Sequence, residues 1–141
     1  CVFTHYALLE LLPNFSYSEK WFRGVFATLL FASLALAINY HKRWYTVVNY
    51  SYFAFVLVLV YLKNRALLKS FFVIFLSILL PFFLVNGILT GSFIDGEVVW
   101  YDNSHNLGIR LFTIPIEDMA YAFSLILTNL FLLELFQGNE K

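Results

Sequence analysis

Four long apolar runs divide this chain and leave it few ways to fold. The first three contain no charged side chain, and the fourth contains only two acids. A helix needs about 20 mostly apolar residues to cross the hydrocarbon core of a bilayer. We therefore predict an all-α integral membrane bundle of about four transmembrane helices plus an N-terminal helix tail. The runs are Gly24–Ile38, Trp44–Leu62, Ser70–Ile94 and Leu111–Leu133.

Composition supports this prediction and excludes several classes of function. The chain is 61% hydrophobic and only 13% charged, whereas a soluble domain carries about 25% charged residues. Its formal net charge is zero, so we expect no nucleic-acid partner. A single cysteine rules out an internal disulfide and a cysteine-built metal site. There is no G-x-G-x-x-G motif for a dinucleotide, and we expect neither a metal nor another cofactor.

Turn and cap signals set the expected boundaries. Residues 1–12 look like the tail of a preceding helix, ended by Pro13 and Asn14, and Ser18 is placed to cap the next helix. Asp95–Gly96 would suit a hairpin turn. Lysines and arginines are spread too evenly among the loops to fix the membrane orientation. We treat 1–141 as one membrane domain whose spanning helices are expected at about 19–40, 44–62, 67–90 and 113–136.

Two adjacent carboxylates, Glu117 and Asp118, interrupt the fourth run shortly after Pro115. One interpretation is ordinary helix initiation, in which proline and acids occupy the first turn and the acids stay at the membrane interface. The other is a functional site, because a carboxylate drawn into the apolar zone tends to stay protonated and can act as an acid. Spacing alone leaves these two interpretations evenly matched.

Other residues near these acids are candidates for binding. Glu117, Tyr121, Ser124 and Thr128 have helical spacing and are predicted to form a stripe that faces the bundle interior. Arg110 is a possible partner for a carboxylate or a lipid headgroup, and Trp100 and Tyr101 are possible interfacial anchors. Asn86 needs a hydrogen-bonding partner, for which a contact between helices is the more ordinary explanation.

Three segments together resemble a known family. They are "NGILTG" (86–91), "VVWYDNSHNLGIR" (98–110) and "TIPIEDMAYAF" (113–123). This order is similar to the lycopene cyclase domain of the heterodimeric type, whose Pro-x-Glu-Glu/Asp motif opens a membrane helix. Here the motif is Pro115, Ile116, Glu117 and Asp118. The family is built from two similar three-helix units, so the resemblance implies that this chain holds the second unit and the last helix of the first.

The resemblance also implies a chemistry. Members of this family look like redox-neutral isomerases, intramolecular lyases of bacterial carotenoid biosynthesis, that need no cofactor and convert the linear ends of lycopene to β-rings. Glu117 and Asp118 would be the catalytic acid and base, while Tyr121, Phe123 or Trp100 would stabilise a cation, with Asn86 and Arg110 as further binding candidates. The implied partners are lycopene or a related linear carotenoid, the bilayer of the bacterial inner membrane, and the missing N-terminal repeat or a partner subunit.

An alternative function stays open at this point. The chain would then be a non-enzymatic membrane bundle that binds carotenoid or assembles a complex, and the two acids would only initiate a helix.

Overall fold

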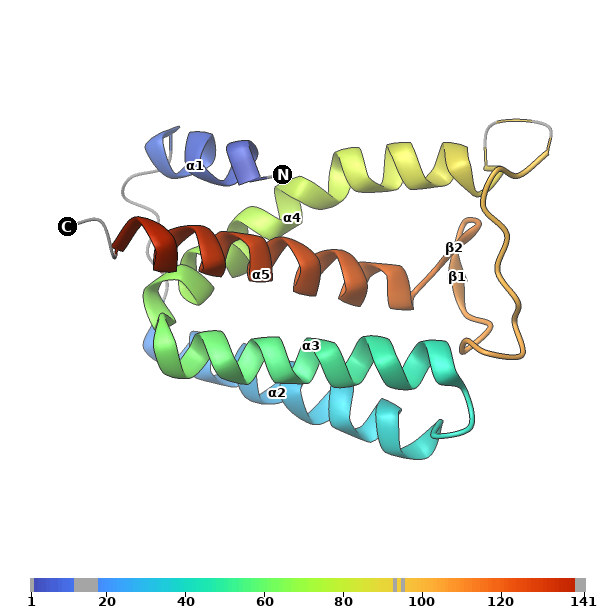
Figure 1. Ribbon diagram of the computed structural model, residues 1–141, viewed down its shortest axis with the longest axis horizontal. Helices are drawn as coiled ribbons and strands as arrows, with labels where there is room; N and C mark the ends of the chain where they lie inside the picture. The colour runs from blue at the N-terminus through green and yellow to red at the C-terminus, as the bar shows by residue number, and fades with distance from the viewer. Residues whose placement is uncertain (1, 12–17, 93, 95, 139–141) are drawn as a thin grey trace.

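The computed structural model describes residues 2–11, 18–92, 94 and 96–138. Within them the regular secondary structure is helical apart from one very short hairpin (Figure 1), and four helices are long and apolar enough to cross a membrane. The predicted all-α membrane bundle is thereby confirmed. The elements are α1 (Val2–Leu11), α2 (Glu19–Asn39), α3 (Trp44–Lys63), α4 (Arg65–Leu89), β1 (Arg110–Leu111), β2 (Ile114–Pro115) and α5 (Glu117–Gly138).

Helix α3 lies at the centre and packs against both α2 and α5, while α4 packs against α1, α3 and α5. The shared core is aromatic and is organised around Phe123 of α5. Its ring centroid lies 4.9 Å from those of Phe53, Phe71 and Phe75. Because these rings come from three different helices, the position of α5 is fixed relative to α3 and the first half of α4.

Two helix starts differ from the prediction. Helix α4 begins at Arg65 rather than near residue 67, because Asn64 caps it by accepting from the Leu67 amide (3.1 Å). Helix α5 begins at Glu117 rather than near residue 113, because residues 110–115 pair as β1 and β2. The predicted Ser18 cap is confirmed. The predicted hairpin turn includes Asp95, which lies outside the described residues.

Large apolar side chains also cover the outside of the bundle. Phe31, Phe55 and Leu80 are each more than 60% exposed, at 76%, 63% and 75%. In water such a surface would be costly, whereas hydrocarbon is its natural surrounding. The chain is thus an integral membrane protein whose lipid supplies the outer contacts.

The short helix α1 carries a buried histidine. His5 is fully buried, and neither ring nitrogen has a hydrogen-bond partner among the described residues. Its ring packs against those of Tyr6 and Phe71, with centroids 5.5 and 6.0 Å away. Burial lowers the pKa of His5 below its usual 6.5, because the charged form would lose its hydration.

This burial predicts a pH-dependent attachment of α1. With α1 detached, His5 takes up a proton as the pH falls through about 6.5, whereas in the folded protein it stays neutral until lower pH. The contribution of the buried neutral His5 to the attachment of α1 is therefore complete above a pH of about 6.5, and it is lost progressively as the pH falls below that value. We expect the melting temperature in detergent to fall between pH 7 and pH 5 more for the unchanged chain than for His5→Leu. Equal pH dependence in both would contradict this prediction.

Candidate active site

Both acids lie at the first turn of α5, where a loop closes one end of the bundle. Glu117 is 0% exposed and Asp118 is 4% exposed. The loop runs from the end of α4 through β1 and β2 and reaches across to α3 (Figure 1). The acids are therefore buried in protein, and the helix N-terminus favours negative charge at this place.

The two oxygens of the Glu117 carboxyl have different surroundings. Oε1 accepts from the Thr46 hydroxyl and from the Leu107 amide, both at 2.7 Å. Oε2 is buried and has no hydrogen-bond partner among the residues that the structure describes. A buried anionic oxygen without a donor is strongly unfavourable. Oε2 is thus the oxygen of this carboxyl that no described donor occupies.

Asp118 is surrounded by phenol donors. The Tyr45 hydroxyl of α3 donates to Oδ1, and the Tyr101 hydroxyl of the loop donates to Oδ2 at 2.7 Å. The two rings lie close together, with centroids 5.8 Å apart. Burial, followed by the bond to Asp118, raises the pKa of Tyr101 above its usual 10.0, so this phenol keeps its proton and remains a donor. Both oxygens of Asp118 thus act as acceptors.

Arg110 organises the part of the loop that carries Tyr101. Its guanidinium donates to the Thr113 carbonyl (2.9 Å) and to the Tyr101 carbonyl (3.3 Å), and it lies 5.9 Å from the centre of the Tyr101 ring. In the described part of the chain it forms no ion pair with either acid. Its effect on the site therefore passes mainly through the placement of Tyr101.

A second set of contacts joins the loop to α3. The His105 carbonyl accepts from the Tyr45 amide at 3.0 Å, at the start of α3. Asn106 is buried, and its side-chain oxygen accepts from the Gly108 amide (2.7 Å). Gly108 has a φ of +72°, a conformation that glycine adopts without strain. This turn presents the Leu107 amide to Glu117.

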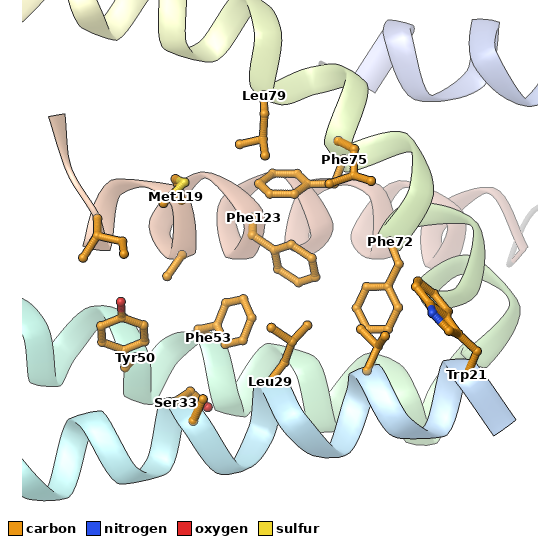
Figure 2. Close-up of a pocket in the computed structure, with 15 residues that line it drawn as sticks. Trp21, Leu29, Ser33, Tyr50, Phe53, Phe72, Phe75, Leu79, Met119 and Phe123 are labelled. Atoms are coloured by element: carbon orange, nitrogen blue, oxygen red, sulfur yellow. The ribbon is translucent and has the colours of Figure 1, made fainter. Parts of the chain in front are cut away.

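An apolar cavity of about 420 Å³ lies between α2, α3, α4 and α5. Figure 2 shows Tyr50 and Met119 toward one end and Trp21 toward the other. Ile116, Met119 and Ala120, which flank Glu117 in the chain, are among its lining residues. The Tyr50 hydroxyl interacts electrostatically with Glu117. Neither Glu117 nor Asp118 is itself among the lining residues, so it is these chain neighbours that bring the acids near one end of the cavity.

The structure brings some of the predicted site residues to this cavity and not others. Phe123 lines the cavity, and Arg110 lies beside Tyr101. Tyr121 is 47% exposed and Trp100 is 71% exposed, and neither is among the cavity's lining residues. Asn86 donates to the Phe82 carbonyl of its own helix (3.1 Å), rather than across to another helix.

The predicted polar stripe of α5 needs correction at Tyr121. Glu117 and Ser124 are fully buried and Thr128 is half-buried, as expected for an inward face. The opposing apolar face, Phe123 and Ile126 included, is buried too, because α5 packs against α3 on one side and against α1 and α4 on the other. The remaining strip that faces outward contains Tyr121, Leu125, Asn129 and Leu132.

Sequence reasoning missed the residues that hold the acids. Thr46 and Tyr45 of α3 were not singled out, and Tyr101 was considered only as an interfacial anchor. One signal was available: Thr46, Asn49 and Tyr50 have helical spacing at the start of the second apolar run. Polar side chains on one face of a membrane helix indicate a partner inside the bundle, and that partner is the start of α5.

Comparison with known proteins gives one result. A family model described as lycopene cyclase matches residues 42–136. The matched region contains α3, α4, the closing loop and nearly all of α5, and with them both acids and their hydrogen-bond donors. No curated protein and no solved structure matches the chain.

Proposed function

The chain belongs to the lycopene cyclase family, and on that basis we propose that it is a membrane isomerase that closes the linear end groups of lycopene into β-rings. One observation carries the proposal: a buried carboxyl, Glu117, has one oxygen without a partner among the described residues, and its chain neighbours Ile116, Met119 and Ala120 line an apolar cavity. A polyene end group offers no hydrogen bonds, so it suits such a cavity. The carboxyl supplies the proton that the reaction needs.

The proposed reaction is balanced without an oxidant or a reductant. The O–H bond at Oε2 of Glu117 breaks as its proton adds to the terminal double bond, which leaves a tertiary cation. The electron pair of an internal double bond then forms the carbon–carbon bond that closes the six-membered ring, and the cation moves into the ring. A base then removes a proton from a ring carbon, and the electron pair of the broken C–H bond becomes the new double bond. The product is an isomer of the substrate.

Aromatic rings are well placed to stabilise the cation. Phe53 of α3 and Phe123 of α5 line the cavity, as does Tyr50. The face of an aromatic ring attracts a cation, most strongly where water is absent. Exclusion of water also prevents capture of the cation as an alcohol. We assign no part in the chemistry to Tyr121 or Trp100, which are exposed on the outside of the protein, or to Asn86, which donates to its own helix.

Asp118 is the proposed acceptor of the ring proton, since both its oxygens receive hydrogen bonds in the structure. We further propose that the chain works with an upstream repeat, on the same polypeptide or as a partner subunit, which supplies a second acidic motif. The proposed location is the bacterial inner membrane, whose hydrocarbon core holds both enzyme and substrate.

The proposal predicts where one hydrogen atom of the product comes from. Membranes of lycopene-making cells that contain the chain together with its upstream half are incubated in D₂O. Each ring formed is expected to carry one solvent-derived deuterium, because the acid exchanges with solvent between turnovers. In H₂O the product mass should equal that of lycopene. A product that is two hydrogens lighter or heavier than lycopene would contradict the proposed redox-neutral reaction.

The alternative, a bundle that binds pigment or assembles a complex, predicts a different outcome. Lycopene would copurify with the chain and remain linear, with or without the upstream half. Replacement of both acids by amides would then leave the pigment unchanged. The buried position of the acids favours the cyclase, because initiation of a helix alone does not require burial.

A further inference from the structure

The two acids receive different hydrogen bonds, and this difference indicates different roles for them. Asp118 receives a phenol hydrogen on each oxygen, whereas Oε2 of Glu117 receives none from the described residues. We propose that Tyr45 and Tyr101 are positioning residues that keep the negative charge on Asp118 and thereby leave the transferable proton on Glu117. This inference rests on the proposed cyclase function and adds two residues to it.

Geometry carries the inference in three steps, of which the first concerns donors. A protonated Asp118 would carry its own hydrogen on one oxygen, so only the phenol facing the other oxygen could still donate to it. As an anion, Asp118 accepts from both phenols and leaves neither without a partner. Hydrogen bonds to a charged group are about twice as strong as neutral ones. The pair of phenols therefore favours the anion.

The second step concerns the neighbouring acid. Glu117 and Asp118 are consecutive residues that interact electrostatically inside protein. Two buried carboxyls that repel each other do not both ionise readily. A charge fixed on Asp118 therefore keeps Glu117 neutral, which agrees with the bare Oε2. Because the phenols act on Glu117 only through Asp118, they are not catalytic residues themselves.

The third step concerns how the phenols are held. Tyr45 belongs to α3, and its amide is bonded to the loop through the His105 carbonyl. Tyr101 belongs to the loop and is held by Arg110. We call the pair Tyr45 and Tyr101 the clamp. It forms only when the loop and the helix bundle meet, because each phenol approaches Asp118 from a different element.

The test compares Tyr45→Phe, Tyr101→Phe and the double variant with Tyr52→Phe. Tyr52 is a matched control, because it is another α3 phenol with a hydrogen bond to α5, here to Thr128 (2.8 Å). Loss of a hydrogen bond to a charged group predicts that each clamp variant turns over about tenfold more slowly. The control should stay close to the unchanged chain. The lycopene content of vesicles that gives half-maximal rate should not change, because the phenols do not touch the substrate.

Infrared spectra supply a readout that turnover alone does not. The spectrum of the unchanged chain should contain the carbonyl band of a buried protonated carboxyl, and the single substitution Glu117→Gln should remove it. The single substitution Asp118→Asn should instead remove a carboxylate band. In the variant that lacks both phenols, Asp118 should be partly protonated, so that part of the carbonyl band comes from Asp118. If Asp118→Asn removes the carbonyl band from the unchanged chain, the proposed assignment is wrong.

The outcomes distinguish this inference from the proposed function. An unchanged chain that produces rings, with clamp variants equal to Tyr52→Phe, would overturn the clamp and leave the cyclase standing. An unchanged chain that produces no rings with its upstream half would overturn the cyclase, while the infrared bands still decide the charge on Asp118. If the double variant fails to fold, the single variants and the bands of the unchanged chain decide.

Discussion

Replacing Glu117 with Gln is expected to lower the rate of ring formation by about 100-fold or more, the usual contribution of a positioned general acid. Glutamine keeps the size of the side chain and can still accept from Thr46 and the Leu107 amide. It has no proton acidic enough for a carbon–carbon double bond. Lycopene should therefore accumulate while the protein still inserts and folds. The measurement is the ratio of cyclised to linear pigment in membranes that also contain the upstream half.

Glu134→Gln is the matched control for this experiment. Glu134 lies near the other end of α5, where it accepts from the Asn64 side chain. Its replacement removes an acid from the same helix without touching the site, so pigment conversion should stay close to normal. Full conversion by Glu117→Gln would exclude Glu117 as the proton donor. Equal losses in the two variants would indicate a general effect of acid removal on the fold.

Replacing Ala120 with Phe is expected to reduce conversion by about 100-fold as well, because small displacements of a reacting group have effects of this size. Ala120 is buried and lines the cavity one turn after Glu117. A phenyl group at this position would occupy the space where we place the end group. The rate of ring formation is measured in the same membranes, and the melting temperature shows whether the bundle stays intact.

Leu125→Phe provides the comparison for added bulk. Leu125 lies on the outward strip of α5 and is partly exposed, so a larger side chain there extends into lipid. It should leave both melting temperature and conversion nearly unchanged. Unimpaired ring formation by a folded Ala120→Phe protein would show that the substrate's end group binds elsewhere.

The spanning helices were predictable because their signal is local. A run such as Trp44–Leu62 carries no charge and is mostly apolar, and hydrocarbon requires its backbone to bond within a helix. The observed α3 differs from this run by one residue. The start of α5 was predicted four residues too early. There the apolar run continues through residues 111–116, and hydropathy does not distinguish a strand from a helix in a short apolar segment.

The two acids of the site could be predicted from the sequence, but the residues that surround them could not. Glu117 and Asp118 stand out because charge is rare in an apolar run. Two of their donors, Thr46 and Tyr45, come from 71 and 73 residues earlier in the chain, and no periodicity connects such distant positions. The Leu107 amide leaves no trace in the sequence, since every residue except proline carries an amide.

The same separation has a consequence for biosynthesis. The donors on α3 are synthesised before the acids of α5, so Tyr45 and Thr46 precede their acceptors into the membrane. A helix that begins with two carboxyls is costly to insert alone, and here it enters beside a neighbour that already carries hydroxyl groups. A permuted gene that placed α5 before α3 would reverse this order. We expect such a chain to insert less efficiently, although its folded contacts would be the same.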